Sequence, residues 1–304
     1  MASLSATVGK LRLANPTILA AGVLGMTAEQ MLEALKGGAA AVVTKSIGLK
    51  GADGHPNPTM VETVTGYLNC MGLPNPGIDN FKSEVEGVVK RDGIVIGSVY
   101  AKDAKGFATL ARKMESYGAS AVELNLSCPH AAGLGAEIGS SPARVENVTR
   151  AVKKAVDIPV FPKLTPNVQR IAELALAAER GRADGIVAIN TLKAMAILPE
   201  AAMPVLSNAY GGYSGPGIKP VGVRCVYEIA GEVDIPIIGV GGICSGRDAV
   251  EYMMAGAAAV QIGSAVAAHG PGVFAKVCAE IEGFMNANGY KKISDLVGAA
   301  RGGK

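Results

Sequence analysis

Short apolar segments recur eight times along the chain and alternate with stretches in which apolar residues return every three or four positions. A continuous apolar run of this length is typical of a parallel strand buried on both faces, and the intervening period is that of an amphipathic helix. The predicted strands span residues 15–22, 40–45, 94–100, 121–128, 159–163, 185–190, 235–242 and 258–264. The predicted helices span residues 27–37, 79–91, 103–117, 142–156, 168–181, 219–232, 246–256 and 271–288.

This alternation predicts the α/β class and one domain over residues 1–304. Eight βα units close most simply into a (β/α)8 TIM barrel. Residues 3–13 alternate apolar and polar around Gly9, which predicts a short N-terminal β-hairpin that plugs the bottom of the barrel. Connections that are too long for simple turns usually carry function. Three of these follow predicted strands, at residues 46–77, 129–141 and 192–219.

Composition narrows the possible partners and location. Of the 304 residues, 49% are hydrophobic, and the net charge is only +3. Because no Lys/Arg cluster with interleaved aromatic residues occurs, we expect no nucleic-acid partner. No apolar run approaches the roughly 20 residues that a membrane span needs. The amino terminus has neither a basic nor an apolar signal region, so we expect a cytoplasmic protein without membrane attachment.

The cysteines and histidines give no metal-binding pattern. The five cysteines are an odd number without C-x-x-C spacing, which argues against a disulfide framework or a metal cluster. Cys225 and Cys278 lie in helix-period segments and are predicted to be inert core residues. His55 and His130 lie in predicted mouth loops, but the strand ends offer mainly amides and lysines, so we expect no catalytic metal. Cys128 differs because it ends a predicted strand and precedes a proline.

Polar residues end several of the predicted strands. In a (β/α)8 barrel these positions converge on one mouth, where such enzymes carry out their chemistry. The residues are Lys45, Asn125, Cys128, Lys163 and Asn190. A lysine in an apolar mouth needs an anionic partner to offset its desolvation. We therefore expect Lys45 and Lys163 to contact a ligand.

Glycine-rich turns follow the last two predicted strands, at residues 239–243 and at Gly263-Ser264. Glycine lets backbone N–H groups approach an anion, and helix N-termini after these strands add the positive end of a dipole. Barrel enzymes commonly bind phosphate there. Ser214-Gly-Pro-Gly-Ile-Lys-Pro220 adds a third such turn. The alternative is that these glycines only permit tight turns.

Four motifs in order carry a family resemblance. They are Asn69-Cys-Met-Gly-Leu-Pro-Asn-Pro-Gly77, Asn125-Leu-Ser-Cys-Pro-His130, Asn190-Thr-Leu-Lys-Ala-Met195 and Ser214-Gly-Pro-Gly-Ile-Lys-Pro220. With them the chain resembles class 1 dihydroorotate dehydrogenase over nearly its whole length. The forms of the last two motifs resemble the class 1B catalytic subunit.

The resemblance implies an FMN-dependent oxidation of (S)-dihydroorotate to orotate in de novo pyrimidine (UMP) biosynthesis. Cys128 would be the base that removes the C5 proton while hydride leaves C6 for flavin N5. The pyrimidine contacts implied are Lys45, Asn69, Met71, Gly72, Leu73, Asn125, His130, Asn190 and Thr191. The FMN contacts implied are Ala21, Gly22, Lys45, Ser46, Asn125, Lys163, Ile189, Ser214, Gly215, Gly241, Gly242, Gly263 and Ser264.

Three positions depart from the family pattern and keep alternatives open. His130 stands where better-known members carry asparagine, Met60 where arginine is expected, and Ala21 where serine is common. Another dihydropyrimidine is therefore an alternative substrate, since dihydropyrimidine dehydrogenase has a similar flavin domain. A non-redox barrel enzyme that binds a phosphorylated substrate and a non-catalytic FMN-binding scaffold subunit are further alternatives.

The resemblance also implies partners. A homodimer is expected, and class 1B catalytic subunits pair with an FAD and iron–sulfur subunit that passes electrons to NAD⁺, in a heterotetramer. This chain has no ferredoxin-type cysteine cluster, so FAD and the iron–sulfur cluster would belong to the partner. The final electron acceptor stays open.

Overall fold

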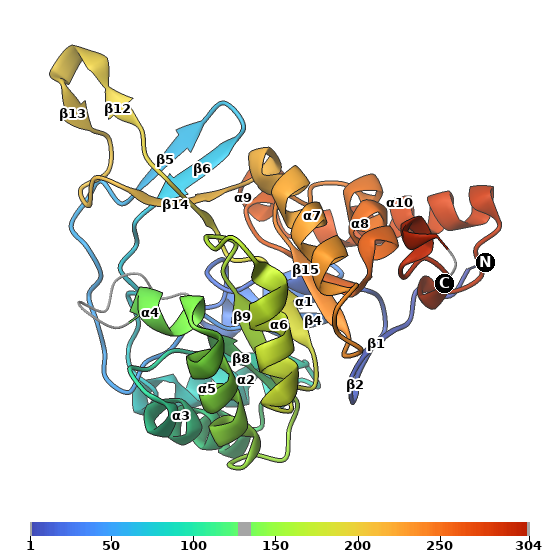
Figure 1. Ribbon diagram of the computed structural model, residues 1–304, viewed down its shortest axis with the longest axis horizontal. Helices are drawn as coiled ribbons and strands as arrows, with labels where there is room; N and C mark the ends of the chain where they lie inside the picture. The colour runs from blue at the N-terminus through green and yellow to red at the C-terminus, as the bar shows by residue number, and fades with distance from the viewer. Residues whose placement is uncertain (1, 127–134, 303–304) are drawn as a thin grey trace.

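The computed structural model describes residues 2–126 and 135–302. In this part of the chain, eight parallel strands close into a barrel in which each strand neighbours the next along the sequence (Figure 1). The predicted (β/α)8 fold is confirmed. The strands are β3 (Thr17–Leu19), β4 (Ala41–Val43), β7 (Val95–Val99), β8 (Ala121–Asn125), β9 (Val160–Leu164), β10 (Ile186–Ala188), β15 (Ile237–Val240) and β16 (Ala257–Ile262).

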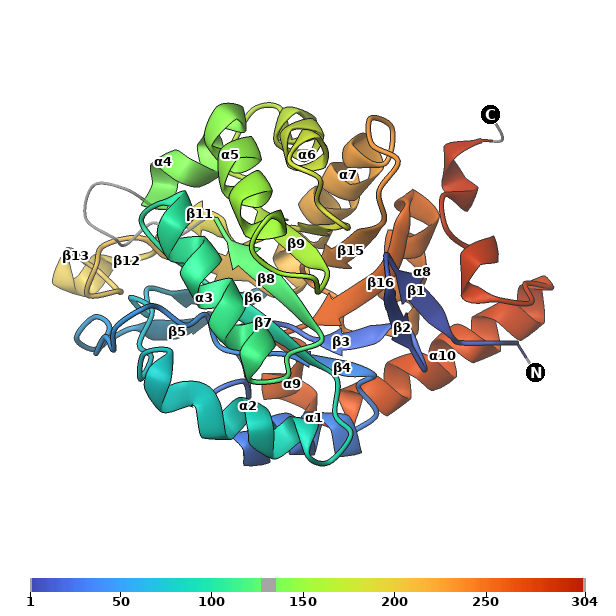
Figure 2. The ribbon, with the colours of Figure 1, turned by 90° about the horizontal axis from the view of Figure 1, so that it is seen from below.

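Helices surround these strands and cover their outer faces (Figure 2). The helices are α1 (Ala28–Lys36), α2 (Lys82–Val89), α3 (Ala104–Ser116), α4 (Gly135–Ser140), α5 (Pro142–Lys153), α6 (Ile171–Arg180), α7 (Lys219–Ile229), α8 (Gly246–Ala255), α9 (Ala265–His269) and α10 (Val273–Asn288). Single 3₁₀ turns occur at Asp79–Phe81, Pro199–Ala201, Pro216–Ile218, Ile293–Asp295 and Ala299–Arg301. None of the described helices combines the length and apolar content needed to cross a membrane.

The N-terminal hairpin forms as predicted, from β1 (Ala6–Val8) and β2 (Leu11–Leu13). Its turn contains Gly9 with a left-handed φ of 58°. A Cβ at Gly9 would lie only 2.9 Å from the carbonyl oxygen of Asp184, which precedes β10. The hairpin therefore packs at the amino-terminal end of the barrel, where Val8 and Leu11 are buried.

Two of the long connections contain strands that the sequence pattern did not predict. They hold β5 (Met60–Thr63), β6 (Gly66–Asn69), β11 (Leu192–Ala194) and β14 (Gly211–Ser214), which form an antiparallel sheet in the order β11-β14-β6-β5. A further pair, β12 (Ile197–Leu198) and β13 (Met203–Pro204), projects away from the barrel (Figure 1). Sheet pairing such as Asn69 with Gly212 joins residues distant in sequence, so no local pattern shows it.

The fourth barrel strand is shorter than predicted. We expected residues 121–128, but β8 ends at Asn125. Cys128 and His130 lie outside the described residues. The expected loop at 129–141 contains the short helix α4, which begins at Gly135.

Candidate active site

A hydrogen-bonded chain of side chains crosses the barrel mouth. The hydroxyls of Ser98 on β7 and Ser46 after β4 lie 2.9 Å apart. Asn125, at the end of β8, donates from Nδ2 to Ser46 Oγ at 3.0 Å. Asn190, after β10, donates from Nδ2 to Asn125 Oδ1 at 3.4 Å, and its Oδ1 accepts from the backbone N–H of Thr191 at 2.8 Å. These contacts orient both amides, and each keeps one Nδ2 hydrogen without an acceptor among the described residues.

A buried polar triad lies beneath this chain. Glu123 precedes Asn125 by two positions on β8, so both side chains point into the barrel and Glu123 lies one layer deeper. Lys163 Nζ, on β9, donates to Gln261 Oε1 at 3.1 Å and lies 3.3 Å from Glu123 Oε1. Gln261 Nε2, on β16, donates to Glu123 Oε2 at 2.7 Å.

The triad is sealed from solvent. Glu123 is 0%, Gln261 1% and Lys163 6% exposed. The contact between Lys163 and Glu123 is an ion pair by distance but lacks hydrogen-bond geometry, which leaves Glu123 Oε1 without a donor among the described residues. We treat the contact as a charge pair, because 3.3 Å between opposite charges in a dry interior is a strong attraction whatever the angle.

Lys45, in contrast to Lys163, has no counter-charge among the described residues. It follows β4 by two residues and is half-buried, and its Nζ makes no ion pair or hydrogen bond within the described part of the chain. Burial lowers the pKa of Lys45 from its ordinary value of 10.5. An anion bound beside Nζ would offset this desolvation, as expected for a lysine that contacts a ligand.

The predicted glycine-rich turns gather at one corner of the mouth. The register of β15 and β16 pairs Val240 with Gln261, so Gly242 and Gly263 follow neighbouring strand ends. Gly242 has a left-handed φ of 71°, and a Cβ there would lie 2.7 Å from the carbonyl oxygen of Gly215 in the third turn. Gly22, after the adjacent strand β3, has a φ of 95° and open space where a Cβ would point.

One part of the expected anion site is wrong. The N-terminus of α8 is already occupied by carboxylates of the protein. Asp248 Oδ2 accepts from the N–H groups of Cys244 and Ser245, each at 3.0 Å, and Glu280 Oε2 accepts from Gly246 at 2.6 Å. The N–H groups of Cys244, Ser245 and Gly246 are therefore satisfied and are not available to an outside phosphate.

Lys219, in the third glycine-rich turn, is also occupied. Its Nζ lies 2.8 Å from Asp248 Oδ1 and 2.7 Å from Glu251 Oε2, and these hydrogen bonds raise the pKa of Lys219. The donors that remain are in the loops: the backbone N–H groups of Gly242 and Gly263 have no acceptor in the described ranges. Any anion at this corner would bind loop amides.

The unpredicted antiparallel sheet brings another candidate residue to the mouth. Gly212 on β14 packs against Thr191, since a Cβ at Gly212 would lie 2.2 Å from Thr191 Oγ1. Asn69 on β6 donates from Nδ2 to the carbonyl oxygen of Gly212 at 3.3 Å. The sheet thus places Asn69 near the Asn190-Thr191 end of the hydrogen-bonded chain.

The segment after β6 is held in place by Asn75, which the sequence did not single out. Gly72 and Leu73 have left-handed φ values of 71° and 57°. Asn75 is 6% exposed, and its Nδ2 donates to the Leu73 carbonyl oxygen and to the Tyr100 hydroxyl, both at 2.9 Å. Tyr100 follows β7, so this contact fixes Met71, Gly72 and Leu73 at the rim of the barrel.

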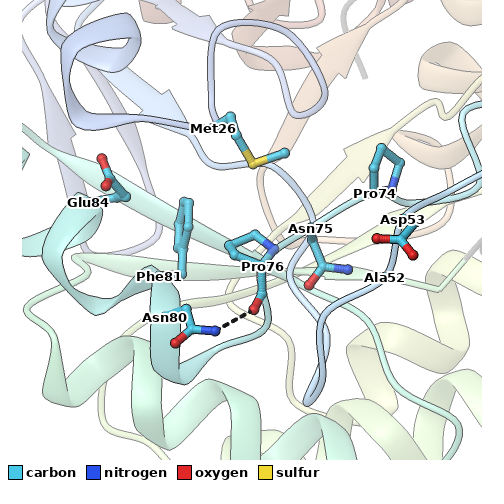
Figure 3. Close-up of a pocket in the computed structure, with 9 residues that line it drawn as sticks. All are labelled: Met26, Ala52, Asp53, Pro74, Asn75, Pro76, Asn80, Phe81 and Glu84. Carbon is cyan, nitrogen blue, oxygen red and sulfur yellow. Dashed lines mark hydrogen bonds between the residues drawn. The ribbon is translucent and has the colours of Figure 1, made fainter.

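An open pocket of about 490 Å³ lies to one side of the mouth, between the connection after β3 and the start of α2 (Figure 3). Its lining residues are Met26, Ala52, Asp53, Pro74, Asn75, Pro76, Asn80, Phe81 and Glu84. Asn80 donates to the Pro76 carbonyl oxygen at 3.0 Å, and Phe81 is fully buried behind it. None of the predicted ligand contacts lines this pocket, so its size does not indicate the reaction site.

Three of the described cysteines are unsuited to proton abstraction. Burial raises the pKa of Cys225 to about 11 and also raises the pKa of Cys244 and Cys278. Cys225 and Cys278 are buried in α7 and α10, as predicted for inert core residues. No cluster of three metal-ligating side chains occurs within residues 2–126 and 135–302.

A closed (β/α)8 barrel with fixed amides, clustered glycine turns and a half-buried lysine that lacks a counter-charge among the described residues is typical of barrel enzymes that act on small anionic molecules. The family model described as dihydroorotate dehydrogenase matches residues 3–285. The chain belongs to the dihydroorotate dehydrogenase family, and the resemblance seen in its motifs is confirmed.

Similar proteins named "Dihydroorotate dehydrogenase B (NAD(+)), catalytic subunit" occur in several archaea. The protein of Thermoplasma acidophilum is 52% identical over 301 residues, which cover 99% of both chains. That of Methanocaldococcus jannaschii is 51% identical over 290 residues, 94% of both chains. That of Pyrococcus furiosus is 51% identical over 287 residues, 94% of this chain and 95% of the relative.

Proposed function

We propose that residues 1–304 form one FMN-binding barrel domain, the catalytic subunit of a class 1B dihydroorotate dehydrogenase, which oxidises (S)-dihydroorotate to orotate in de novo pyrimidine biosynthesis. Family membership supports the reaction. The observation that carries the proposal is the oriented amide chain of Asn125 and Asn190 together with buried Lys163, which pairs with Asn125 on the neighbouring strand. It provides polar contacts for a pyrimidine and a cation for a flavin at the same mouth.

The residues present fit FMN. Its phosphate needs N–H donors without other acceptors, and the amides of Gly242 and Gly263 meet that need. Gly22 leaves open space on the adjacent strand. Lys163 supplies positive charge in a dry environment, where a negative charge on the flavin ring is stabilised most. Ala21, Ser46, Ile189, Ser214, Gly215, Gly241 and Ser264 complete the proposed cofactor contacts.

The chain's own residues would bind and orient the substrate. When bound, FMN accepts the hydride from C6. Asn69, Asn125, Asn190 and Thr191 offer the donors and acceptors that an imide and a carboxylate require. Lys45 would serve as the cation for the substrate carboxylate, which also relieves its own desolvation.

Cys128 is the proposed base for the C5 proton, and His130 is a proposed substrate contact. Both rest on the Asn125-Leu-Ser-Cys-Pro-His130 motif, since they lie outside the described residues. Met71, Gly72 and Leu73 are the proposed contacts from the rim. Met60, where the family pattern has arginine, is 62% exposed on the edge strand β5.

We also propose that the chain works with a second subunit. The relatives' printed names describe a catalytic subunit and NAD⁺, which supports a separate electron-transfer partner. That partner would carry FAD and an iron–sulfur cluster, in a heterotetramer built on a homodimer of this chain.

The test is anaerobic flavin reduction. FMN-loaded protein should absorb near 450 nm and bleach in a single turnover with dihydroorotate, faster than with dihydrouracil. Faster bleaching by dihydrouracil would assign another dihydropyrimidine. Bleaching by neither compound would favour a non-catalytic scaffold. Protein that takes up no FMN would favour a non-redox enzyme with a phosphorylated substrate.

A further inference from the structure

The buried carboxylate of Glu123 plays no part in the proposed reaction, yet it lies 3.3 Å from the ammonium of Lys163, the residue that we assign to the flavin. A negative charge there opposes the negative charge that a flavin gains on reduction. An apolar pair of similar size would fill the same space, often with equal or greater stability. The triad of Glu123, Lys163 and Gln261 therefore calls for a role other than packing.

The contacts within the triad suggest that role. Both ends of the Gln261 amide are in use, one accepting from Lys163 and the other donating to Glu123, so the amide has one orientation. An ammonium group has three donors, and these two partners leave at least one free. The β8–β9 register pairs Lys163 with Asn125, at the floor of the mouth.

We propose that Glu123 is a positioning residue: together with Gln261 it holds the Lys163 ammonium fixed at the floor of the mouth. A cation held there would stabilise the negative charge that a bound flavin gains on reduction. Glu123 thereby makes bound FMN easier to reduce, although it never touches the cofactor. This inference rests on the proposed function.

Glu123→Gln tests it, because the substitution keeps the side-chain volume and removes only the charge. The measured quantity is the midpoint potential of bound FMN, together with the affinity of the protein for oxidised FMN. We expect reduced FMN to be bound at least tenfold more weakly relative to oxidised FMN, a fall of about 30 mV for a two-electron couple. Glu123→Asp keeps the charge and should stay within threefold of wild type.

A double-mutant comparison separates action through Lys163 from a direct effect. Lys163→Met should lower the potential, and adding Glu123→Gln to it should lower the potential no further. Asp184→Asn is the matched control, since it removes a carboxylate paired with Lys153 at 2.7 Å at the opposite end of the barrel. The midpoint potential of FMN bound to Asp184→Asn should equal that of FMN bound to the wild-type protein.

An unchanged or raised potential in Glu123→Gln would overturn the inference, and so would an additive effect in the Lys163→Met background. If Glu123→Gln does not fold, Gln261→Leu takes its place. Gln261→Leu removes one acceptor of Lys163 and should weaken the binding of reduced FMN, relative to oxidised FMN, at least threefold. An unchanged ratio of these two affinities would equally overturn the inference. Wild-type protein that takes up no FMN would instead refute the proposed function itself.

Discussion

Replacing Gly263 by alanine separates ligand binding from folding at the glycine-rich corner. Among the described residues other than its chain neighbours, a Cβ at this position would meet only the Ala20 Cβ, at 3.4 Å, an ordinary van der Waals contact. No left-handed φ is involved, so the substitution should leave stability unchanged or raise it by about 0.4–1 kcal/mol through the unfolded state. The added methyl, however, takes space beside an N–H group that we assign to the FMN phosphate.

The expected loss is one hydrogen bond to a charged group, about 1.5–3 kcal/mol, or roughly 10–100-fold in FMN affinity. Gly242→Ala should behave differently. Its φ of 71° and the 2.7 Å approach to the Gly215 carbonyl oxygen strain any side chain. Left-handed alanine costs roughly 1–2 kcal/mol before the clash is counted. This variant should lose stability and FMN affinity together.

Gly283→Ala is the matched control. Gly283 lies within α10, and outside that helix's own backbone no atom of the described residues lies within 4 Å of its Cβ position. Alanine should therefore stabilise the helix by up to about 1 kcal/mol and leave FMN binding unchanged. The assays are thermal unfolding of the apoprotein and titration of FMN by fluorescence quenching. Wild-type FMN affinity in Gly263→Ala, with normal unfolding, would refute our placement of the phosphate.

Three further substitutions test single residues. Burial lowers the pKa of Lys45, so its charge destabilises the fold below that pKa, a penalty that disappears toward pH 10.5. Lys45→Met should therefore raise the apoprotein Tm at pH 7 and raise it less at pH 10, while slowing flavin reduction by dihydroorotate. Cys128→Ala should keep FMN but slow its reduction by about 10²–10⁴-fold in stopped-flow measurements, and an unchanged rate would remove Cys128 from the mechanism. His130→Asn should keep turnover within about tenfold, whereas His130→Ala should weaken orotate binding by roughly 1–3 kcal/mol in titration; equal affinities would exclude His130 as a contact.

The barrel could be predicted because each of its strands is buried on both faces. A segment such as Ala41–Val43 is buried at every position and apolar throughout, whichever strands lie beside it, so its sequence alone indicates a buried parallel strand. The antiparallel sheet at the mouth lacks this property. Asn69 and Gly212 pair across 143 residues, and β14 begins with two glycines. Its stability comes from tertiary contacts that no local window contains.

Some residues of the candidate site could likewise be predicted from the sequence, and others could not. Strand ends identified Asn125 and Asn190, because parallel strands must bring their carboxyl ends together. Glu123 could have been placed inside the barrel from the two-residue period that it shares with Asn125. Its partner Gln261 lies 138 residues away on β16, so the chemistry of the pair could not be predicted from spacing.

Lys45 and Lys163 show what the structure adds to the sequence. The sequence treats them alike, as lysines that end strands in an apolar mouth. The structure gives Lys163 a counter-charge 3.3 Å away and gives Lys45 none within the described residues. The charge of Lys163 is therefore compensated by the fold itself before any ligand binds. For Lys45, a bound anion would offset the solvation that its charge loses on burial. Binding an anion beside Lys45 must then raise its pKa, and a proton is taken up as the anion binds wherever the pH lies between the pKa values of the free and bound states.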